Sequence, residues 1–333
     1  MVFLSTSVNE TNSSRRLLTL FFCVELHLLE PFRIHILGCG SAMPTLRHHP
    51  SSQVIEIREK LFMVDCGEGT QVQLRRAKIK FTKLQAVFIT HLHGDHCLGL
   101  IGMLSTFGML GRTAPLHIYA PQALEALLQT QIAVFCPGLE YEVKFHAVET
   151  TQHQVIYEDR SLTVESIPLA HRLPCCGFLF REKPVLPHIR REMIDFYEIP
   201  VSQINNIKNG ADWTTSEGEI VSNHRLTYPA APPRSYAYCS DTRYLPHLHQ
   251  LVQGVDMLYH EATYDQENES RAEMFAHSTA AQAAMVARDA RVGKLLLGHY
   301  SARYDDESVL LQEAKHIFPN SFLTDEGQVF DVK

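Results

Sequence analysis

The sequence predicts an α/β fold in which layers of sheet and helix position a metal site. Short apolar, β-branched runs alternate with helical segments, in the order strand, strand, histidine cluster, helix, strand, helix, strand, strand. Successive strands also end in polar side chains that are able to bind metal. Chance seldom places such residues all at the same end, so we expect these strand ends to meet.

The composition is that of an ordinary globular protein. The chain has 333 residues, of which 45% are hydrophobic and 20% charged, and its net charge is −7. An overall basic surface is therefore excluded, and a nucleic acid would have to be bound by a local patch or by metals. Eight cysteines without regular spacing indicate reduced thiols in a cytoplasmic protein. No apolar run approaches the roughly 20 residues that cross a membrane, so we expect no membrane partner.

The first 31 residues are interpreted as an N-terminal extension that is disordered or reflects a non-native start. Polar residues come first, and the pair Arg15-Arg16 and an apolar run follow. A signal peptide is disfavoured because no small-residue cleavage site precedes Pro31. The folded domain is therefore expected over residues 32–333.

The first strand of that domain is predicted at residues 33–37. The glycine-rich segment 38–45 lacks the third glycine of a dinucleotide fingerprint and the Lys-Ser/Thr of a P-loop, so it is predicted to be a tight turn. Residues 53–58 and 60–65 alternate like a hairpin, and a helix is expected over 71–77. Asp65 ends the second hairpin strand, where it could accept a hydrogen bond from a metal-binding histidine or belong to the turn before the helix.

The segment Thr90-His91-Leu92-His93-Gly94-Asp95-His96 dominates the chain and follows a buried strand at 85–90. The ligands are expected in a loop at the strand end. Because positions i and i+2 of an extended segment point the same way, His91 and His93 can share one metal ion. A turn at Gly94 would let Asp95 and His96 face a second ion. Imidazole and carboxylate ligands suit zinc better than manganese or iron.

Further elements follow the cluster. Helices are predicted over 97–110 and 121–131, and strands over 116–119, 143–145 and 162–167. His171 comes just after the last of these strands. Considered alone, His171 would be an ordinary core or surface histidine. Because the cluster at residues 91–96 still lacks a ligand, we favour a metal-binding role for His171. Cys175-Cys176 could be ligands or a redox pair, and we favour small buried hydrophobic residues.

Residues 181–234 differ in character, with mixed charge, several prolines and weak periodicity, and predict an insertion that projects from the domain. Within it we expect a helix over 189–196 and a turn over 205–210. The core pattern then resumes. Predicted strands at 235–239, 255–259 and 294–297 end near Asp241, Glu261 and His299, and His277-Ser278-Thr279 begins a helix over 280–290.

The order His91-x-His93-x-Asp95-His96, His171, Asp241, His299 resembles the metallo-β-lactamase superfamily, whose fold is a four-layered αβ/βα sandwich. Three features narrow the resemblance, which covers residues 32–333. They are Cys66-Gly67-Glu68-Gly69-Thr70-Gln71 after Asp65, the helix start at His277, and His299-Tyr300-Ser301-Ala302-Arg303-Tyr304. Together they resemble the ribonuclease Z family in its short bacterial form.

The resemblance implies an endoribonuclease that cleaves the 3′ trailer from precursor tRNA and leaves a 3′-hydroxyl. It implies two zinc ions per subunit, one held by His91, His93 and His171, the other by Asp95, His96 and His299, with Asp241 bridging. Asp95 would also be the general base. The remaining implied residues are His277 and Glu261, near the leaving group, and Arg303, the family's arginine after the last ligand.

The resemblance also implies a homodimer, in which the arm of one subunit holds precursor tRNA over the active site of the other. The family's arm usually has a Gly-Pro turn with nearby lysines, whereas residues 199–210 have no Gly-Pro and one lysine. The insertion, about 181–234, offers Arg190, Arg191 and Lys208 as candidate RNA-binding residues. A solvated loop without function is the alternative.

Two other functions fit parts of the sequence. One is a phosphodiesterase of the same superfamily that acts on small or other nucleic-acid substrates, and it is favoured if the insertion does not bind RNA. The other is a non-enzymatic RNA-binding subunit. Such a subunit would lack ligands, whereas every ligand position here is filled.

Overall fold

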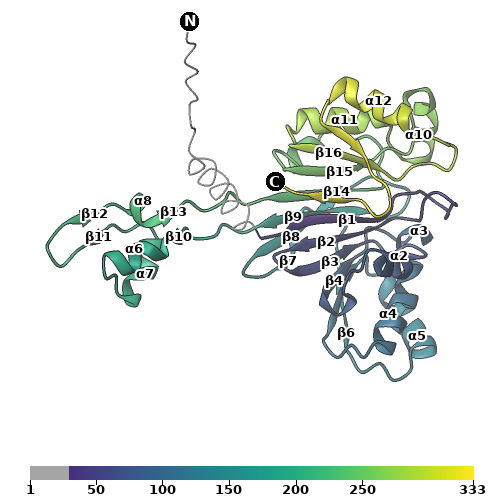
Figure 1. The fold of residues 1–333 in the computed structure, drawn as a ribbon. Coiled ribbons are helices and arrows are strands. Elements are labelled where there is room, and N and C mark those ends of the chain that lie inside the picture. Colours follow the sequence, from purple (N-terminus) through teal and green to yellow (C-terminus); the bar gives the residue numbers. More distant parts are fainter. Residues whose placement is uncertain (1–29) are drawn as a thin grey trace, which may run out of the picture.

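The computed structural model describes residues 30–333, so the predicted extension over 1–31 lies outside the described residues except for its last two. Figure 1 shows two sheets face to face, helices on both outer faces, and a lobe that projects from one end. The predicted four-layered αβ/βα sandwich is confirmed. In the described part of the chain, none of the helices has the length and apolar character needed to span a membrane.

The first sheet has seven strands in the order β18-β1-β2-β3-β4-β5-β6. β2 and β3 form the predicted antiparallel hairpin, and β3 to β6 run parallel. Helices α2, α4 and α5 cover its outer face (Figure 1). The bounds are β1 Phe32–Gly38, β2 Ser52–Ile57, β3 Lys60–Val64, α2 Thr70–Arg76, η1 Phe81–Lys83, β4 Leu84–Phe88, α3 Gly94–Cys97, α4 Gly99–Met109, β5 Leu116–Ala120, α5 Leu124–Phe135, β6 Val143–Ala147 and β18 Val329–Asp331.

The second sheet also has seven strands, in the order β17-β16-β15-β14-β9-β8-β7. β14 to β17 run parallel, and α10, α11 and α12 lie on the outer side of this sheet (Figure 1). The bounds are β7 Gln154–Glu158, β8 Leu162–Pro168, β9 Cys176–Glu182, β14 Ser235–Cys239, α9 Leu248–Leu251, β15 Met257–Glu261, η2 Gln266–Asn268, α10 Glu269–Phe275, α11 Ala280–Asp289, β16 Lys294–Gly298, α12 Ser308–Ile317 and β17 Ser321–Leu323.

Aromatic side chains fill the space between the two sheets. Phe62, Phe88, Phe178, Phe180 and Tyr236 are fully buried, and the rings of Phe88 and Phe180 meet edge to face at 5.5 Å. Burying such a side chain contributes about 1.5–3 kcal/mol. This packing fixes the sheets so that the carboxyl ends of their parallel strands face one edge of the sandwich.

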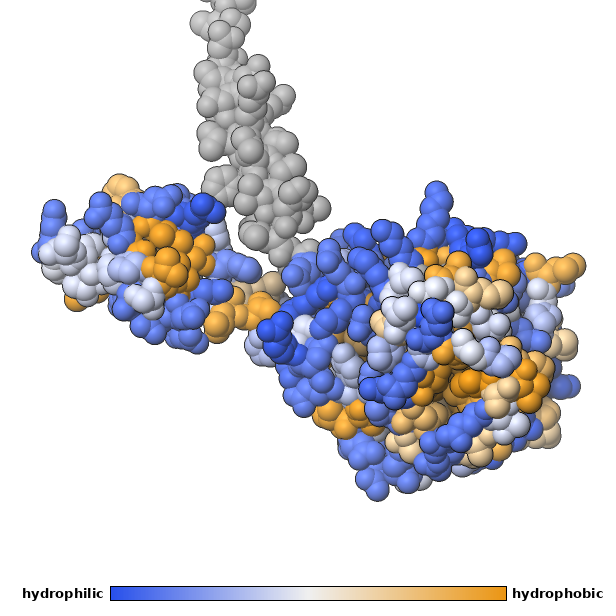
Figure 2. Space-filling view, turned by 90° about the horizontal axis from the view of Figure 1, so that it is seen from below, coloured by the Kyte–Doolittle hydropathy of each residue, from blue (hydrophilic) through white to orange (hydrophobic). Residues whose placement is uncertain are grey.

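The projecting lobe, here called the arm, comprises residues 183–234 between β9 and β14. It has its own apolar cluster of Ile199, Ile207, Val221 and Leu226, and Figure 2 shows it as a separate lobe beside the sandwich. An ion pair between Glu182 and Arg234, at 2.9 Å, joins the two strands at its base. The bounds are β10 His188–Ile189, α6 Arg191–Phe196, α7 Val201–Lys208, β11 Trp213–Thr214, β12 Ile220–Val221, α8 Asn223–Leu226 and β13 Thr227–Tyr228.

Several element predictions need correction. The turn predicted over 205–210 is wrong for its first half, because α7 continues through Lys208 and buries Ile207 in the arm; the chain turns only at Gly210, whose φ is +101°. The helix predicted over 121–131 begins later, at Leu124, and runs to Phe135. Strands β7, β9, β17 and β18 and helices α10 and α12 were not predicted.

Candidate metal centre

The parallel strands of both sheets deliver polar side chains to one edge of the sandwich. Asp65 directly follows β3, His91 follows β4 after two residues, and His299 directly follows β16. Asp241 lies two residues after β14, and Glu261 is the last residue of β15. Asp241 lies 3.7 Å from His91 and 3.2 Å from His299, so the expectation that these strand ends meet is correct.

Asp95 and His96 reach the same edge from a helix and not from the predicted loop. The chain is extended at His93 and enters α3 at Gly94, whose φ is not positive. A Cβ atom there would lie 2.8 Å from Leu98 Cδ1, but this is the end of an exposed side chain that can move aside, so space does not require glycine either. The helical turn places the His96 ring 4.2 Å from the ring of His91, so the two parts of the segment lie side by side.

Three histidines form a first group of converging nitrogens. His91 Nε2 lies 2.9 Å from His93 Nδ1, and His171 Nε2 lies 3.2 Å from the same atom. Asp241 Oδ2 completes the group, at 3.7 Å from His91 Nε2 and 3.8 Å from His171 Nε2. Four potential ligand atoms thus surround one position.

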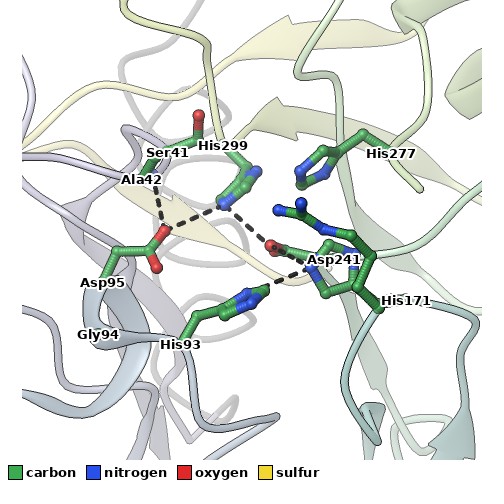
Figure 3. Close-up of a pocket in the computed structure, with 10 residues that line it drawn as sticks. Ser41, Ala42, His93, Gly94, Asp95, His171, Asp241, His277 and His299 are labelled. Carbon is green, nitrogen blue, oxygen red and sulfur yellow. Dashed lines mark hydrogen bonds and ion pairs between the residues drawn. The ribbon is translucent and has the colours of Figure 1, made fainter. Parts of the chain in front are cut away.

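A second group lies beside the first. Asp95 Oδ2 is 3.5 Å from His96 Nε2 and 3.6 Å from His299 Nε2. Asp241 faces this group with its other oxygen, since Oδ1 lies 3.4 Å from His96 Nε2 and 3.2 Å from His299 Nε2. Asp241 therefore presents one carboxylate oxygen to each group (Figure 3).

The chemistry of both groups fits divalent cations. His96 Nε2 and His299 Nε2 are buried and form no hydrogen bond with the described residues, although both face carboxylates. Burial lowers the pKa of His91, His93 and His171, which favours the neutral ring that binds metal. Imidazole and carboxylate donors suit divalent transition metals. A cation at each position would satisfy the unpartnered nitrogens.

In four of the candidate ligand histidines, the ring nitrogen that faces away from the metal position contacts a residue that is not itself a candidate ligand. His96 Nδ1 lies 2.7 Å from Asp65 Oδ2, and His171 Nδ1–H donates to the carbonyl of Ala276 at 2.9 Å. Thr90 and Thr263 approach His91 Nδ1 and His299 Nδ1 at 3.0 and 2.9 Å. Such contacts fix the orientation of each ring and the nitrogen that faces the metal.

Asp65 acts as an acceptor for the cluster and does not cap the following helix. Its carboxylate also accepts hydrogen bonds from the backbone and hydroxyl of Thr90 and from the hydroxyl of Tyr238. Helix α2 has Gly69 at its N-cap position. The structure thus distinguishes between the two roles that spacing left open.

A cavity of about 290 Å³ opens onto the centre (Figure 3). His277 lies at its wall, with Nδ1 at 3.0 and 3.2 Å from the two oxygens of the buried Glu261. Burial opposes protonation of His277, but Glu261 outweighs it and raises the pKa of His277 to about 9. Glu261 is itself held by the backbone N–H of Thr242, at 2.6 Å, and of Ser278, at 3.1 Å.

Two features of the cavity were missed from the sequence. Arg172 lines the cavity and directly follows His171 in the sequence. This position next to a predicted metal ligand could have identified Arg172 as a candidate site residue. Ala42 donates its backbone N–H to Asp95 Oδ2 at 2.7 Å (Figure 3), so the turn after β1 positions a ligand. A hydrogen bond donated by the backbone cannot be predicted from the pattern of side chains.

Other candidate residues lie away from this cavity. Arg303 donates to Ser301 Oγ at 3.2 Å and stacks over the Tyr264 ring, outside the cavity lining. In the arm, Arg190 stacks over Tyr228, Arg191 is exposed, and Lys208 lines a separate cavity at the arm base. Cys175 and Cys176 are buried and free, and neither belongs to a metal-binding group of the described residues.

The four-layered sandwich with a histidine–aspartate centre at its edge defines a protein of the metallo-β-lactamase fold. The chain is 60% identical over 298 residues to a curated protein named Ribonuclease Z from Phocaeicola vulgatus, covering 90% of this chain and 96% of that protein. It is 56% identical to Ribonuclease Z from Bacteroides thetaiotaomicron, covering 91% and 96%. The chain belongs to the ribonuclease Z family.

The other comparisons concern the fold. The human short-form tRNase Z structure has a TM-score of 0.65 at 23% identity, and covers 90% of this chain and 99% of that one. The metallo-β-lactamase fold protein YhfI from Bacillus subtilis has a TM-score of 0.65 at 18% identity, with the same coverage. The family model described as Anti-Pycsar protein Apyc1 matches residues 32–187.

Proposed function

We propose that this chain is a metal-dependent endoribonuclease that cleaves the 3′ trailer from precursor tRNA and leaves a 3′-hydroxyl on the tRNA. The main support is a complete set of ligands around the bridging Asp241, with the His277–Glu261 pair at the cavity wall. The relatives named Ribonuclease Z support the substrate. A non-enzymatic role is disfavoured because no ligand position is vacant in the sequence.

The proposed cofactor is two zinc ions per subunit. The first group of His91, His93 and His171 would hold one ion and the second group of Asp95, His96 and His299 the other, with Asp241 shared. When bound, such a pair lowers the pKa of a water molecule and stabilises negative charge in the transition state.

The chain's own residues would move the protons. Asp95 is the proposed base: Oδ2 is occupied by the Ala42 N–H, and no described residue donates a hydrogen bond to Oδ1, which is free to accept a proton. His277 is the proposed acid. Because Nδ1 faces Glu261, Nε2 is the atom that would protonate the departing 3′ oxygen of the tRNA.

Arg172 is the proposed phosphate contact. It is the one lysine or arginine among the described residues that line the cavity, and its guanidinium lies 5.6 Å from the centre of the Phe275 ring. A guanidinium binds phosphate oxygens in a bidentate manner. We therefore assign Arg172 to the phosphates that flank the cleavage site.

The arm is the proposed tRNA-binding element. It is a separate lobe with its own core, so it can present charged side chains at a distance from the metals. Arg190, Arg191 and Lys208 are its candidate phosphate contacts. Because the chain as a whole is acidic, affinity for tRNA must depend on such local contacts and should fall with salt.

A homodimer is also proposed, with the arm of one subunit over the active site of the other. Helices α4 and α5 carry exposed apolar side chains, which include Met109, Leu127, Val134 and Phe135. Figure 2 shows a broad hydrophobic area on this side of the sandwich. Large exposed apolar patches mark interaction sites. A protein that sediments as a monomer and is fully active at the same concentration would contradict the dimer.

The test of this function compares two substrates. The purified protein should cleave a precursor tRNA with a far higher kcat/KM than bis-nitrophenyl phosphate, a small phosphodiester. Equal values for the two substrates, or no cleavage of the tRNA, would instead favour the phosphodiesterase that acts on small substrates.

A further inference from the structure

A second cluster of metal-binding side chains lies apart from the candidate centre. Cys39 follows β1, His48 lies in the loop before β2, and Glu326 lies in the turn between β17 and β18. Their potential ligand atoms all lie within 4.8 Å of one another. The cluster thus joins the end of the first strand of the domain to the connection between its last two strands, which lie in different sheets.

The thiol of Cys39, the Nδ1 atom of His48 and the two carboxylate oxygens of Glu326 lie at distances close to those between the ligands of one metal ion. Cys39 Sγ lies 3.3 Å from His48 Nδ1, and His48 Nδ1 lies 3.0 Å from Glu326 Oε2. Cys39 Sγ lies 3.7 Å from Glu326 Oε1. Zinc bonds of about 2.0–2.3 Å in a tetrahedron place neighbouring donors roughly 3.3–3.7 Å apart. Small side-chain adjustments would bring the three donors around one ion.

The surroundings of His48 also resemble those of a metal-bound histidine. His48 Nε2, the ring nitrogen that points away from Cys39, lies 3.4 Å from Glu307 Oε1. Both atoms are buried and form no hydrogen bond of good geometry with the described residues. A carboxylate at the far nitrogen of a metal-binding histidine fixes the ring and strengthens it as a ligand. Arg47 holds the other oxygen of Glu307 at 2.6 Å.

We propose that Cys39, His48 and Glu326 form an additional, structural zinc site, distinct from the catalytic centre. The thiolate, imidazole and carboxylate donors are typical zinc ligands. The fourth position would be taken by water or by Asp325, whose Oδ1 lies 3.9 Å from His48 Nδ1. Zinc binding replaces the Cys39 thiol proton, which leaves to solvent.

Access and charge are compatible with this site. Glu326 lines a cavity of about 440 Å³ and His48 lines a smaller one of about 120 Å³, so an ion can enter from solvent. Burial, together with Glu326 and Asp325, raises the pKa of Cys39. A divalent cation would offset the negative charge of these carboxylates, and its affinity should decrease as pH falls.

The site would support the catalytic centre through the backbone. Cys39 accepts a hydrogen bond from the Tyr300 N–H through its carbonyl, and Ser41 N–H donates to the Tyr300 carbonyl, each at 3.0 Å. Tyr300 follows His299, and Ala42 binds Asp95. An ion at Cys39 would therefore stabilise the turn after β1. This turn orients the proposed ligand Asp95 and lies beside the segment that carries the proposed ligand His299.

Cobalt substitution separates this site from the catalytic centre. Among the described residues, Cys39 is the only cysteine in a metal-binding group, so a thiolate-to-cobalt charge-transfer band in the ultraviolet that depends on Cys39 reports this site. The full-length protein, freed of metal with a chelator and reloaded with Co²⁺, should show the band. Cys39→Ser should lose it and bind one metal ion fewer per chain, and Glu326→Gln should weaken it.

The control is Cys97→Ser, which alters a half-buried thiol beside the histidine cluster and should leave the band unchanged. A reloaded wild-type protein without a thiolate band would overturn the proposal even if Cys39→Ser failed to fold. So would a band that persists in folded Cys39→Ser. The cluster would then be a hydrogen-bonded His48–Glu326 pair without metal. Because the readout is spectroscopic, it is independent of tRNA cleavage.

Discussion

Replacement of His277 by alanine should separate acid catalysis from metal binding. His277 contacts the Glu261 carboxylate at 3.0 Å and belongs to the cavity wall. Its ring also lies within reach of Asp241 and His299, but the first and second groups each have their ligands without it. The variant His277→Ala should therefore retain its metal ions. What it loses is the proton for the departing oxygen.

The expected size of the effect follows from that role. Loss of a positioned general acid slows a reaction by about 10²- to 10⁴-fold, which corresponds to about 2.7–5.4 kcal/mol of transition-state free energy. The upper part of this range is expected for precursor tRNA, because Glu261 raises the pKa of His277 to about 9 and keeps it protonated at neutral pH. The KM for tRNA should change little.

The assay compares two leaving groups. A ribose 3′ oxygen needs a proton as it departs, whereas nitrophenolate leaves without one. His277→Ala should therefore slow single-turnover cleavage of precursor tRNA far more than hydrolysis of bis-nitrophenyl phosphate. Elemental analysis of the same preparation should give the wild-type metal content.

Glu261→Gln provides the matched pH experiment. Removing the carboxylate removes the cause that raises the pKa of His277, so the pKa falls and the alkaline limb of the pH–rate profile moves to lower pH.

If His277→Ala slows both substrates equally or loses metal, then His277 is a ligand or a structural residue and the assignment is wrong.

Asp95→Ala should abolish cleavage and lower the metal content, because it removes both a ligand and the proposed base; measurable turnover by the purified variant would contradict this. Asp65→Asn should weaken metal binding by about 10- to 100-fold, as expected when the outer partner of a ligand is altered, and an unchanged affinity in a chelator competition would exclude the role. Arg172→Ala should raise the KM for precursor tRNA more than the control Arg288→Ala, which alters an exposed arginine at the end of α11; equal values would refute the phosphate assignment. Replacing residues 185–231 with a glycine-serine linker, which retains Glu182 and Arg234 at the base, should leave hydrolysis of bis-nitrophenyl phosphate intact while tRNA cleavage collapses, and an unchanged KM for tRNA would show that the arm does not bind it.

The layered core was predictable because its strands are short apolar runs with clear ends. Asp65, His91, Asp241 and His299 all follow such runs, and parallel strands bring their ends to one edge. The capping residue Thr279 likewise marked the start of α11, where its side chain accepts from Gln282 N–H. Local patterns of this kind are sufficient to place most of the candidate ligands.

Other features depend on contacts that have no local pattern. The Ala42 N–H contact with Asp95 joins residues far apart through the backbone, and the cluster of Cys39, His48 and Glu326 joins the two ends of the domain. Within the arm, Asn205-Asn206 suggested a turn, but burial of Ile207 in the arm's apolar cluster favours helix α7. Tertiary packing overrides local propensity at such positions.

Mapping the product ends of precursor tRNA tests the proposed function most directly. Purified protein loaded with zinc should release a tRNA that ends in a 3′-hydroxyl and a trailer that begins with a 5′-phosphate, and Asp95→Ala should release neither. Cleavage that leaves a 3′-phosphate or cyclic phosphate would contradict attack by water with departure of the 3′ oxygen. So would cleavage that continues undiminished after complete removal of metal.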